Sequence, residues 1–448
     1  MWKSLLACSA GLGLSTASLQ IVPGATWTST NDGRHIQAHG AGVIEEAGTF
    51  YLIGEDKTEG SAFQNINCYS STNLVEWNFE NALLTRQSDG DLGPERVVER
   101  PKVIHNEATS TYVMYLHIDS SNYGEAKVGV ATSNTVCGEY SYLGSFRPLG
   151  FESRDIGLYK DDDGSAYLLT EDRPNGLRID VLSEDYLNVT ENVFTWDRNI
   201  ESPAIWKRGN YYFMFGSLLT GWDPNDNVYS YATSLAGPWS EWAEFADDGA
   251  NTYSSQTSFI LPFGDSAIYM GDRWQPSNLM RSTYVWLPLS ISGETDIWLT
   301  NRVNWIPNVD DGTWEIGPTE SRYEGEDGTL SNGAEAVACS GCSGSSAAGY
   351  IGGSSGGSVD FESVSSDADT KTSIRMRYAN GDSTERYGTV TVNGVAHQVA
   401  FLPTGDGQTT GSSIVHVDLQ SGTGNTLSIT APGGDYGPDL DVVFVPNN

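Results

Sequence analysis

The chain has 448 residues, with 58 acidic against 24 basic side chains and a formal net charge of −34. So acidic a surface repels phosphate, which makes nucleic acid and anionic membranes poor partners and favours a neutral polymer or a hard cation. Its 38% hydrophobic residues and 50 glycines are typical of a folded chain long enough for two or three domains.

The first residues predict a secretory signal peptide, which we assign to residues 1–19. Residues 1–3 are a short basic start, residues 4–14 an apolar stretch too short to span a bilayer, and residues 15–18 are small. No later segment approaches the roughly 20 apolar residues of a membrane span. We therefore expect an exported, soluble protein, with Asn188 in its Asn-Val-Thr sequence as a possible glycan site.

The cysteines fit export. One of the five lies in the signal peptide, and an even number in the remaining exported chain suggests two disulfides. Cys339 and Cys342 are close in sequence, with no second cysteine pair or histidine cluster nearby, so a local bridge is favoured over a zinc site. Cys68 and Cys137 then remain as the other pair, by elimination.

Residues 20–321 repeat an aromatic strand five times, at intervals of about 45 to 60 residues. The copies are residues 50–55, 112–117, 166–171, 211–216 and 267–272. Each interval is long enough for one four-stranded sheet, so the pattern predicts an all-β domain built as a five-bladed β-propeller. A large β-sandwich would leave this period unexplained.

Residues 322–448 form a second predicted domain. Tryptophan disappears here, and the composition turns to Gly, Ser, Ala, Val and Asp. Runs such as 373–378, 389–392 and 442–445 alternate in polarity and are separated by glycine-rich turns. This pattern predicts a β-sandwich of the jelly-roll type.

Three carboxylates stand out in the first domain. Glu99, Asp155 and Glu201 each lie one strand before the aromatic strand of their copy and have apolar neighbours, so we expect them together on the propeller axis. Clustered carboxylates push their pKa values apart, and one that stays protonated can act as a general acid. Glycoside hydrolysis requires such a pair of carboxylates. The same groups could instead hold a cation without catalysis.

With this repeat, residues 201–207 and 154–164 resemble glycoside hydrolase family 43, and the likeness covers residues 21–321. The resemblance implies an inverting enzyme with Glu201 as general acid and Asp155 as the residue that adjusts its pKa. The family usually carries an aspartate base on its first strand. Here Gly40 stands in that place and cannot accept a proton.

Because it lacks this aspartate, the chain resembles the exo-β-1,3-galactanase branch of the family. Residues 99–103 and 254–258 resemble that branch too. This resemblance implies that Gln256 activates the attacking water, either by holding it in line or by accepting a proton through its imidic tautomer. Glu99 would then bind a substrate hydroxyl, and the alternative gives Glu99 the role of base. Glu55 and Tyr123 are further candidates for the sugar pocket.

The second domain resembles carbohydrate-binding module family 35 over nearly its whole length. The resemblance implies a Ca²⁺ site made of hard carboxylate oxygens, from Glu324, Glu326 and Asp441. It also implies a sugar site lined by Tyr350, Asn380, Tyr436 and Asp439. Such a module raises the local substrate concentration through its linkage to the enzyme.

Together with the signal peptide, these resemblances imply a secreted, monomeric exo-β-1,3-galactanase that releases galactose from the non-reducing end of β-1,3-galactan, the backbone of arabinogalactan. Ca²⁺ in the second domain is the one cofactor expected, and none is needed for hydrolysis. An arabinofuranosidase or xylosidase of the same fold is the alternative, since specificity depends on the site rather than the fold. The loss of the aspartate base favours a third reading, a non-catalytic carbohydrate-binding propeller.

Overall fold

The structure, a computed structural model, describes residues 18–447. All but the last two residues of the predicted signal peptide therefore lie outside the described residues. Within the described part of the chain, no helix is long and apolar enough to cross a membrane.

The expected all-β class is confirmed, and residues 39–299 form five four-stranded antiparallel sheets. The first contains β1 (His39–Glu46), β2 (Thr49–Glu55), β3 (Asn65–Ser71) and β4 (Asn78–Thr85). The second contains β5 (Val97–Asn106), β6 (Thr111–Asp119), β7 (Lys127–Ser133) and β8 (Ser141–Phe146). The third contains β9 (Ile156–Lys160), β10 (Ala166–Asp172), β11 (Gly176–Leu182) and β12 (Val189–Trp196). The fourth and fifth contain β13 (Glu201–Arg208), β14 (Tyr211–Ser217), β15 (Val228–Ala232), β16 (Ala243–Glu244), β17 (Gln256–Phe263), β18 (Ser266–Arg273), β19 (Thr283–Ser292) and β20 (Asp296–Leu299).

The first strands of these sheets surround a common centre. β1 contacts β5, β5 contacts β9, β9 contacts β13, β13 contacts β17, and β17 returns to β1. Each of the five aromatic runs forms the second strand of its sheet. Because the first strands are antiparallel to the second, every sheet brings the start of its first strand and the end of its second strand to the same end of the ring.

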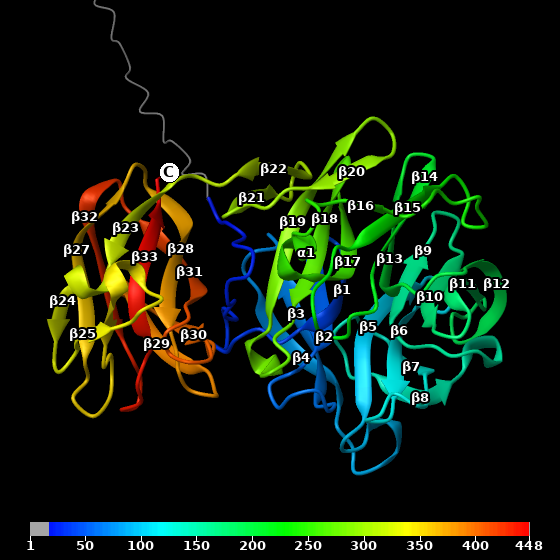
Figure 1. The fold of residues 1–448 in the computed structure, drawn as a ribbon, viewed down its shortest axis with the longest axis horizontal. Coiled ribbons are helices and arrows are strands. Elements are labelled where there is room, and N and C mark those ends of the chain that lie inside the picture. The colour runs from blue at the N-terminus through cyan, green and yellow to red at the C-terminus, as the bar shows by residue number, and fades with distance from the viewer. Residues whose placement is uncertain (1–17, 448) are drawn as a thin grey trace, which may run out of the picture.

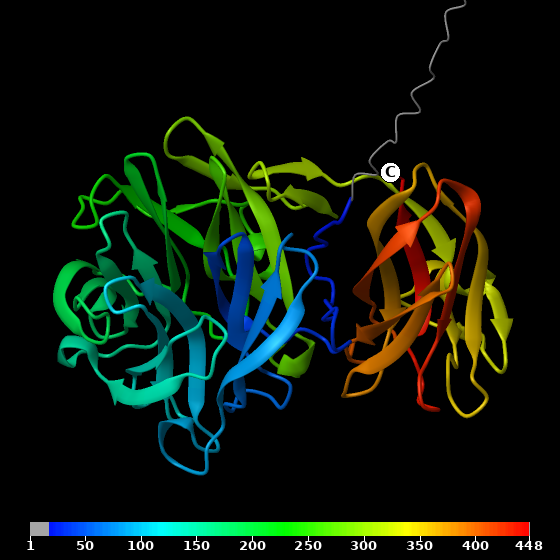
Figure 2. The same cartoon turned by 180° about the vertical axis from the view of Figure 1, so that it is seen from behind.

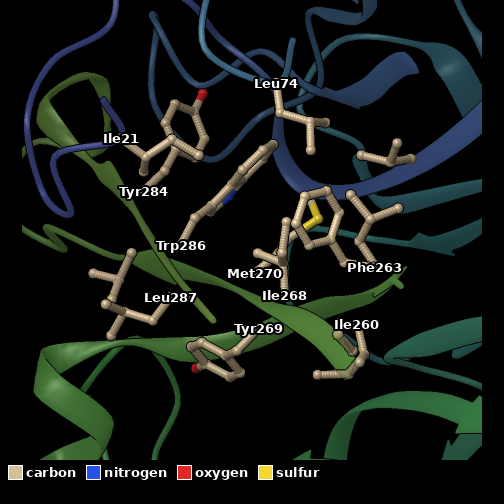
Figure 3. Close-up of a cluster of buried hydrophobic side chains, with 14 of the residues drawn as sticks. Ile21, Leu74, Ile260, Phe263, Ile268, Tyr269, Met270, Tyr284, Trp286 and Leu287 are labelled. Atoms are coloured by element: carbon tan, nitrogen blue, oxygen red, sulfur yellow. The ribbon is translucent and has the colours of Figure 1, made fainter. Parts of the chain in front are cut away.

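The largest apolar cluster joins the first, fourth and fifth sheets, and thereby closes the ring. Trp77, Trp286 and Trp305 are fully buried in it, and Trp286 meets Trp27 edge-on at 4.9 Å between ring centroids. Figure 3 shows side chains of β17, β18 and β19 around Trp286. Most tryptophans of the described chain therefore pack the core and are not free to stack on sugars.

A two-stranded hairpin, β21 (Trp305–Asn308) and β22 (Thr313–Ile316), leads to the second domain. One sheet of that domain contains β23 (Glu320–Glu324), β25 (Glu335–Ala338), β26 (Ser346–Gly349), β28 (Thr370–Ala379), β31 (Gly411–Leu419) and β33 (Asp439–Pro446). The other contains β24 (Thr329–Ser331), β27 (Ser358–Ser366), β29 (Arg386–Val392), β30 (Val395–Phe401) and β32 (Gly422–Thr430). A buried cluster draws side chains from both sheets, as in a sandwich.

Helix is confined to short turns among the described residues. They are α1 (Asn251–Ser254) and the 3₁₀ turns η1 (Gly90–Leu92), η2 (Pro148–Gly150), η3 (Leu279–Arg281), η4 (Gly325–Asp327) and η5 (Ser343–Ser345). Both expected disulfides are present, Cys68–Cys137 and Cys339–Cys342.

Residues 18–38 run between the two domains (Figures 1 and 2). Ile21 pairs with Trp305 of the hairpin, while Thr26 pairs with Ser413 of β31. From the sequence, residues 18–19 are expected to end the signal peptide and residues 20–38 to belong to the first domain. The stretch hydrogen-bonds to both domains, and so fixes one against the other.

Candidate active site

A β-bulge shapes the first strand of three sheets at the same place. Pairing with the second strand slips just after His39, Glu99 and Glu201. The residue that follows each of them has a positive φ, of 55°, 52° and 57° respectively. A bulge bends a strand and re-aims its side chains, and here it lets the first residues of successive strands converge at the ring centre.

The converging side chains come in pairs, one from the first strand and one from the second. The register pairs His39 with Glu55, Glu99 with His117, Glu201 with Ser217 and Gln256 with Asp272, while the Glu171 N–H donates to the Asp155 carbonyl at 3.0 Å. Sequence reasoning named Glu55, Glu99, Asp155, Glu201 and Gln256, and missed the rest. The signal was present: His117, Glu171 and Asp272 end their aromatic runs as Glu55 does.

Glu201 is buried, with 5% of its surface exposed. Its Oε1 accepts a hydrogen bond from Gln256 Nε2 at 2.8 Å. Burial raises the pKa of Glu201, and the carboxylates of Asp155 and Glu171 raise it further, to about 9. The side chain is therefore protonated at neutral pH, as a general acid must be.

Asp155 lies beside Glu201 and is held by donors. Its Oδ2 accepts from the backbone N–H and the hydroxyl of Ser202, at 3.0 and 2.9 Å, and lies 2.7 Å from Arg100 Nε. These contacts fix the carboxylate next to Glu201, where its charge raises the pKa of Glu201.

Glu171 is a third carboxylate at the same point. Oxygens of Asp155, Glu171 and Glu201 all lie within 4.8 Å of one another. Oε1 of Glu171 accepts from Arg173 Nε at 2.6 Å, whereas its buried Oε2 has no hydrogen-bond partner in the described structure. Burial and the nearby Asp155 raise the pKa of Glu171 as well.

Glu99 differs from these groups because cations face it. Lys57 Nζ lies 3.2 Å from its Oε1, and His117 Nδ1 lies 3.6 Å from its Oε2. Burial alone would raise the pKa of Glu99, but Lys57 and His117 lower it to about 2. Tyr123 donates its hydroxyl to the same carboxylate at 3.1 Å. Glu99 is thus an ionised acceptor, with the Tyr123 hydroxyl beside it.

Both the oxygen and the nitrogen of the Gln256 amide make two hydrogen bonds each. The carbonyl oxygen accepts from Arg100 at 2.5 Å and from the Trp274 indole at 2.9 Å. The amide nitrogen donates to Glu201 and, at 3.1 Å, to Ser217 Oγ. Two donors on the oxygen stabilise the amide form, because an imidic hydroxyl in that place would need acceptors.

Gly40 shows how the site accommodates the missing aspartate. A methyl group at Gly40 would lie 2.3 Å from Oε1 of Glu55 and 3.2 Å from the backbone of Arg100. The Glu55 carboxylate, anchored by Lys57 at 2.6 Å, occupies the space into which a side chain at Gly40 would point. The first sheet therefore supplies its carboxylate from the second strand.

Two cavities open near the ring. One, of about 540 Å³, is lined by Trp222, Gln256, Asp272 and Trp274 and adjoins the carboxylates. Trp222 and Trp274 meet edge-on at 4.8 Å between centroids, giving the cavity an aromatic wall. The other, of about 640 Å³, is lined by the far halves of the five first strands. It lies at the opposite end of the ring and holds none of the side chains described above.

In the second domain the expected sugar-site residues have different environments. Tyr350 and Tyr436 are 50% and 52% exposed, and their ring centroids lie 6.3 Å apart. Asp439 begins β33, and burial raises its pKa. Asn380 is fully buried, and its amide is bonded to backbone groups of its own domain. Asn380 therefore shapes its loop, and both N–H groups of its amide are bonded within the domain.

Glu324, Glu326 and Asp441, the residues expected to hold Ca²⁺, lie near η5, but they do not form a described group of three acidic side chains with ligand atoms within 4.8 Å of one another. Ser343 donates its hydroxyl to Glu324 at 3.3 Å and its backbone N–H to Asp441 at 2.8 Å. Oε2 of Glu324 and Oε2 of Glu326 are buried without a partner among the described residues. Asp441, by contrast, is already paired with Arg377. Two of the three carboxylates thus have an oxygen free for a hard cation.

The model of glycosyl hydrolases family 43 matches residues 38–249, and that of the alpha-galactosidase CBM13 domain matches residues 358–445. The second match is to a CBM13-like domain, so the resemblance to family 35 stays a prediction. None of the curated proteins compared with the chain matches it.

Among solved structures, an exo-beta-1,3-galactanase from Phanerochaete chrysosporium with bound galactose is 41% identical, covering 95% of this chain and 99% of its own, with a TM-score of 0.67. Glutamate variants of that enzyme were solved with beta-1,3-galactotriose. A putative exo-beta-1,3-galactanase from Bifidobacterium bifidum is 40% identical over 62% of this chain and 96% of its own, with a TM-score of 0.60. An exo-beta-1,3-galactanase from Clostridium thermocellum is 25% identical, covering 88% of this chain and 100% of its own, with a TM-score of 0.64.

Proposed function

Because the chain belongs to glycosyl hydrolase family 43 and is a glycoside hydrolase, we propose that it is an inverting exo-β-1,3-galactanase. In this proposal the five sheets are the blades of a propeller, and the exported, monomeric protein removes galactose from the non-reducing end of β-1,3-galactan. The observation that carries the proposal is the buried, protonated Glu201 beside Asp155 and Gln256. Three solved relatives whose titles name exo-beta-1,3-galactanases support the substrate.

Glu201 is the proposed general acid. Its proton passes to the glycosidic oxygen as the bond to the anomeric carbon breaks, so the leaving sugar departs as a neutral alcohol. Asp155 and Glu171 keep the proton on Glu201 until then, because ionising Glu201 would bring like charges together. Water attacks from the opposite face of the ring and inverts the anomeric centre.

Gln256 is proposed to hold the attacking water, and Glu99 to accept a substrate hydroxyl. Arg100 and Trp274 fix the carbonyl oxygen of Gln256, which suits positioning better than proton transfer. To hold the water, one amide N–H of Gln256 leaves its contact with Glu201 or Ser217 when the substrate binds. Glu99, ionised and separated from Glu201 by Asp155, remains the alternative proton acceptor. Glu55 and Tyr123 complete the carboxylate and hydroxyl contacts of the pocket.

The second domain is proposed as a carbohydrate-binding module, with exposed Tyr350 and Tyr436 as its stacking surface beside Asp439. Glu324 and Glu326, joined by Asp441, are proposed to hold Ca²⁺. When bound there, the ion would neutralise carboxylates and tie η4 to β33. It takes no part in hydrolysis.

The test is sugar release from linear β-1,3-galactan, arabinan and xylan, measured by chromatography with wild-type protein and Glu201→Gln. Galactose from the galactan alone, lost in Glu201→Gln while galactan binding persists, is expected. Arabinose or xylose release would instead identify the alternative hydrolases of this fold. Binding without any release by wild-type protein would contradict the proposal and support a carbohydrate-binding propeller.

A further inference from the structure

The loop 380–386, which connects β28 to the first residue of β29, touches the first domain at two points. Asn278 Nδ2 donates to the backbone oxygen of Ser383 at 2.8 Å. Glu385 Oε1 lies 3.9 Å from His35 Nδ1, which is beyond hydrogen-bond distance and leaves an electrostatic contact between the carboxylate and the ring. Both contacts are made to segments that lead directly into the catalytic pocket.

The buried side-chain amide of Gln37 connects His35 to Lys57 and Met280. Gln37 Nε2 donates to His35 Nε2 at 2.6 Å, which leaves the His35 Nδ1 proton to face Glu385. Burial lowers the pKa of His35, so the ring is neutral at neutral pH. Gln37 also accepts from the backbone N–H of Lys57 at 2.8 Å and donates to the Met280 carbonyl at 3.2 Å.

The two groups that Gln37 reaches each hold part of the pocket. Lys57 bridges the carboxylates of Glu55 and Glu99. Met280 lies in the segment 274–282, which starts at Trp274 and contributes to the cavity wall. A shift of either segment would therefore move side chains that contact the proposed substrate or Gln256.

The domains are also fixed to each other elsewhere. The segment 18–38 pairs with both, and Ile414 of β31 belongs to the apolar cluster of the first domain. β30 and β31 face the first domain in Figure 1, and Gln398 of β30 donates to Gly33. So the loop 380–386 is presented to the pocket segments in one orientation.

We propose that the second domain completes the catalytic pocket, because its loop 380–386 fixes Lys57 and residues 274–282 through Gln37 and Asn278. Glu385, His35 and Asn278 are then positioning residues, which act through Lys57, Trp274 and Gln256. The proposal rests on the proposed function for its assay substrate. It predicts an effect on a disaccharide, where polymer capture by the second domain plays no part.

The experiment measures kcat and KM for β-1,3-galactobiose with the full chain. Asn278→Ala combined with Glu385→Ala should lower kcat/KM by about tenfold at an almost unchanged unfolding temperature, because small displacements of positioned groups are costly in rate. Glu385→Gln keeps the shape of the side chain and an oxygen beside His35, so its kcat/KM should remain close to that of wild type.

Lys371→Ala is the matched control. It removes another interdomain contact, the 2.6 Å ion pair with Glu76, which lies in the turn between β3 and β4 at the end of the sheet away from Glu55. Its kcat/KM should equal that of wild type.

Equal kcat/KM for the double variant and Lys371→Ala would overturn the proposal while leaving the proposed function intact. Should the double variant unfold early, Glu385→Ala is compared with Glu385→Gln, and equal values again overturn it. Wild-type protein that hydrolyses neither galactobiose nor galactan would overturn both proposals, since no galactoside pocket would exist to be completed.

Discussion

At the scale of single residues, the raised pKa of Glu201 suits a general acid but lowers the stability of the folded protein at neutral pH. An unfolded glutamate titrates near pH 4.5, whereas burial and its carboxylate neighbours hold the pKa of Glu201 at about 9. Below pH 4.5 both states are protonated and folding costs nothing extra. As the pH rises, the unfolded chain releases this proton and the folded chain does not, so stability falls up to about pH 9.

Glu201→Gln should therefore stabilise the protein at neutral pH. At about 1.4 kcal/mol per pH unit, the gain at pH 7 is at most about 3.5 kcal/mol, and it should vanish at pH 4. Thermal unfolding of both proteins at the two pH values measures it. An equal difference in unfolding temperature at pH 4 and pH 7 would mean that Glu201 is not held protonated.

Glu171 offers a second test, in the pH dependence of kcat. Asp155 and Glu171 raise the pKa of Glu201, while Arg100 and Arg173 lower it. Glu171→Gln removes one raising charge, so the alkaline limb of the profile should move to lower pH, by roughly one unit. Glu107→Gln, at the opposite end of the ring, is the control and should leave the limb in place. An unmoved limb in Glu171→Gln would contradict the role given to this carboxylate.

At the scale of elements, the bulge on the first strand brings the site together. Its positive φ suits Gly40 in the first sheet, whereas Arg100 and Ser202 adopt it in the second and fourth. For a non-glycine residue a positive φ costs conformational free energy, and such strain persists only where the surrounding structure holds the residue in place. At Gly40 the neighbouring Glu55 adds a steric limit to the conformational one.

Gly40→Ala should therefore impair both stability and activity. The methyl group displaces the Glu55 carboxylate from Lys57, and the backbone strain costs about 1 kcal/mol. Gly48→Ala is a matched control, because Gly48 also has positive φ but nothing within 4 Å of an added methyl group. It should lose stability only. Equal kcat/KM in the two variants would show that the space at Gly40 is not required.

The sequence predicted the elements better than their pairing. Recurring aromatic runs located the second strands, and carboxylates before them located Asp155 and Glu201. Of the second-strand ends, Glu55 was predicted but His117, Glu171 and Asp272 were not, because only the cross-strand register shows that these ends meet at the same point as the first-strand carboxylates. Likewise, the full hydrogen bonding of Asn380 depends on a loop conformation that no local pattern encodes.

At the scale of the whole molecule, residues 18–38 and the loop 380–386 make the two domains one unit. Nothing in the composition of residues 20–38 indicated that they lie against β28 and β31, because the pairing is formed across more than 350 positions of sequence. The arrangement places the exposed Tyr350 and Tyr436 of one domain in a fixed relation to the pocket of the other.

The most direct test of the account is proton NMR of the purified protein acting on linear β-1,3-galactan. The account predicts that α-galactose appears first and that β-galactose follows by mutarotation, because a protonated Glu201 and a water on the opposite face give inversion. β-Galactose appearing first would contradict the inverting mechanism. Release of longer oligosaccharides before galactose would contradict the exo action.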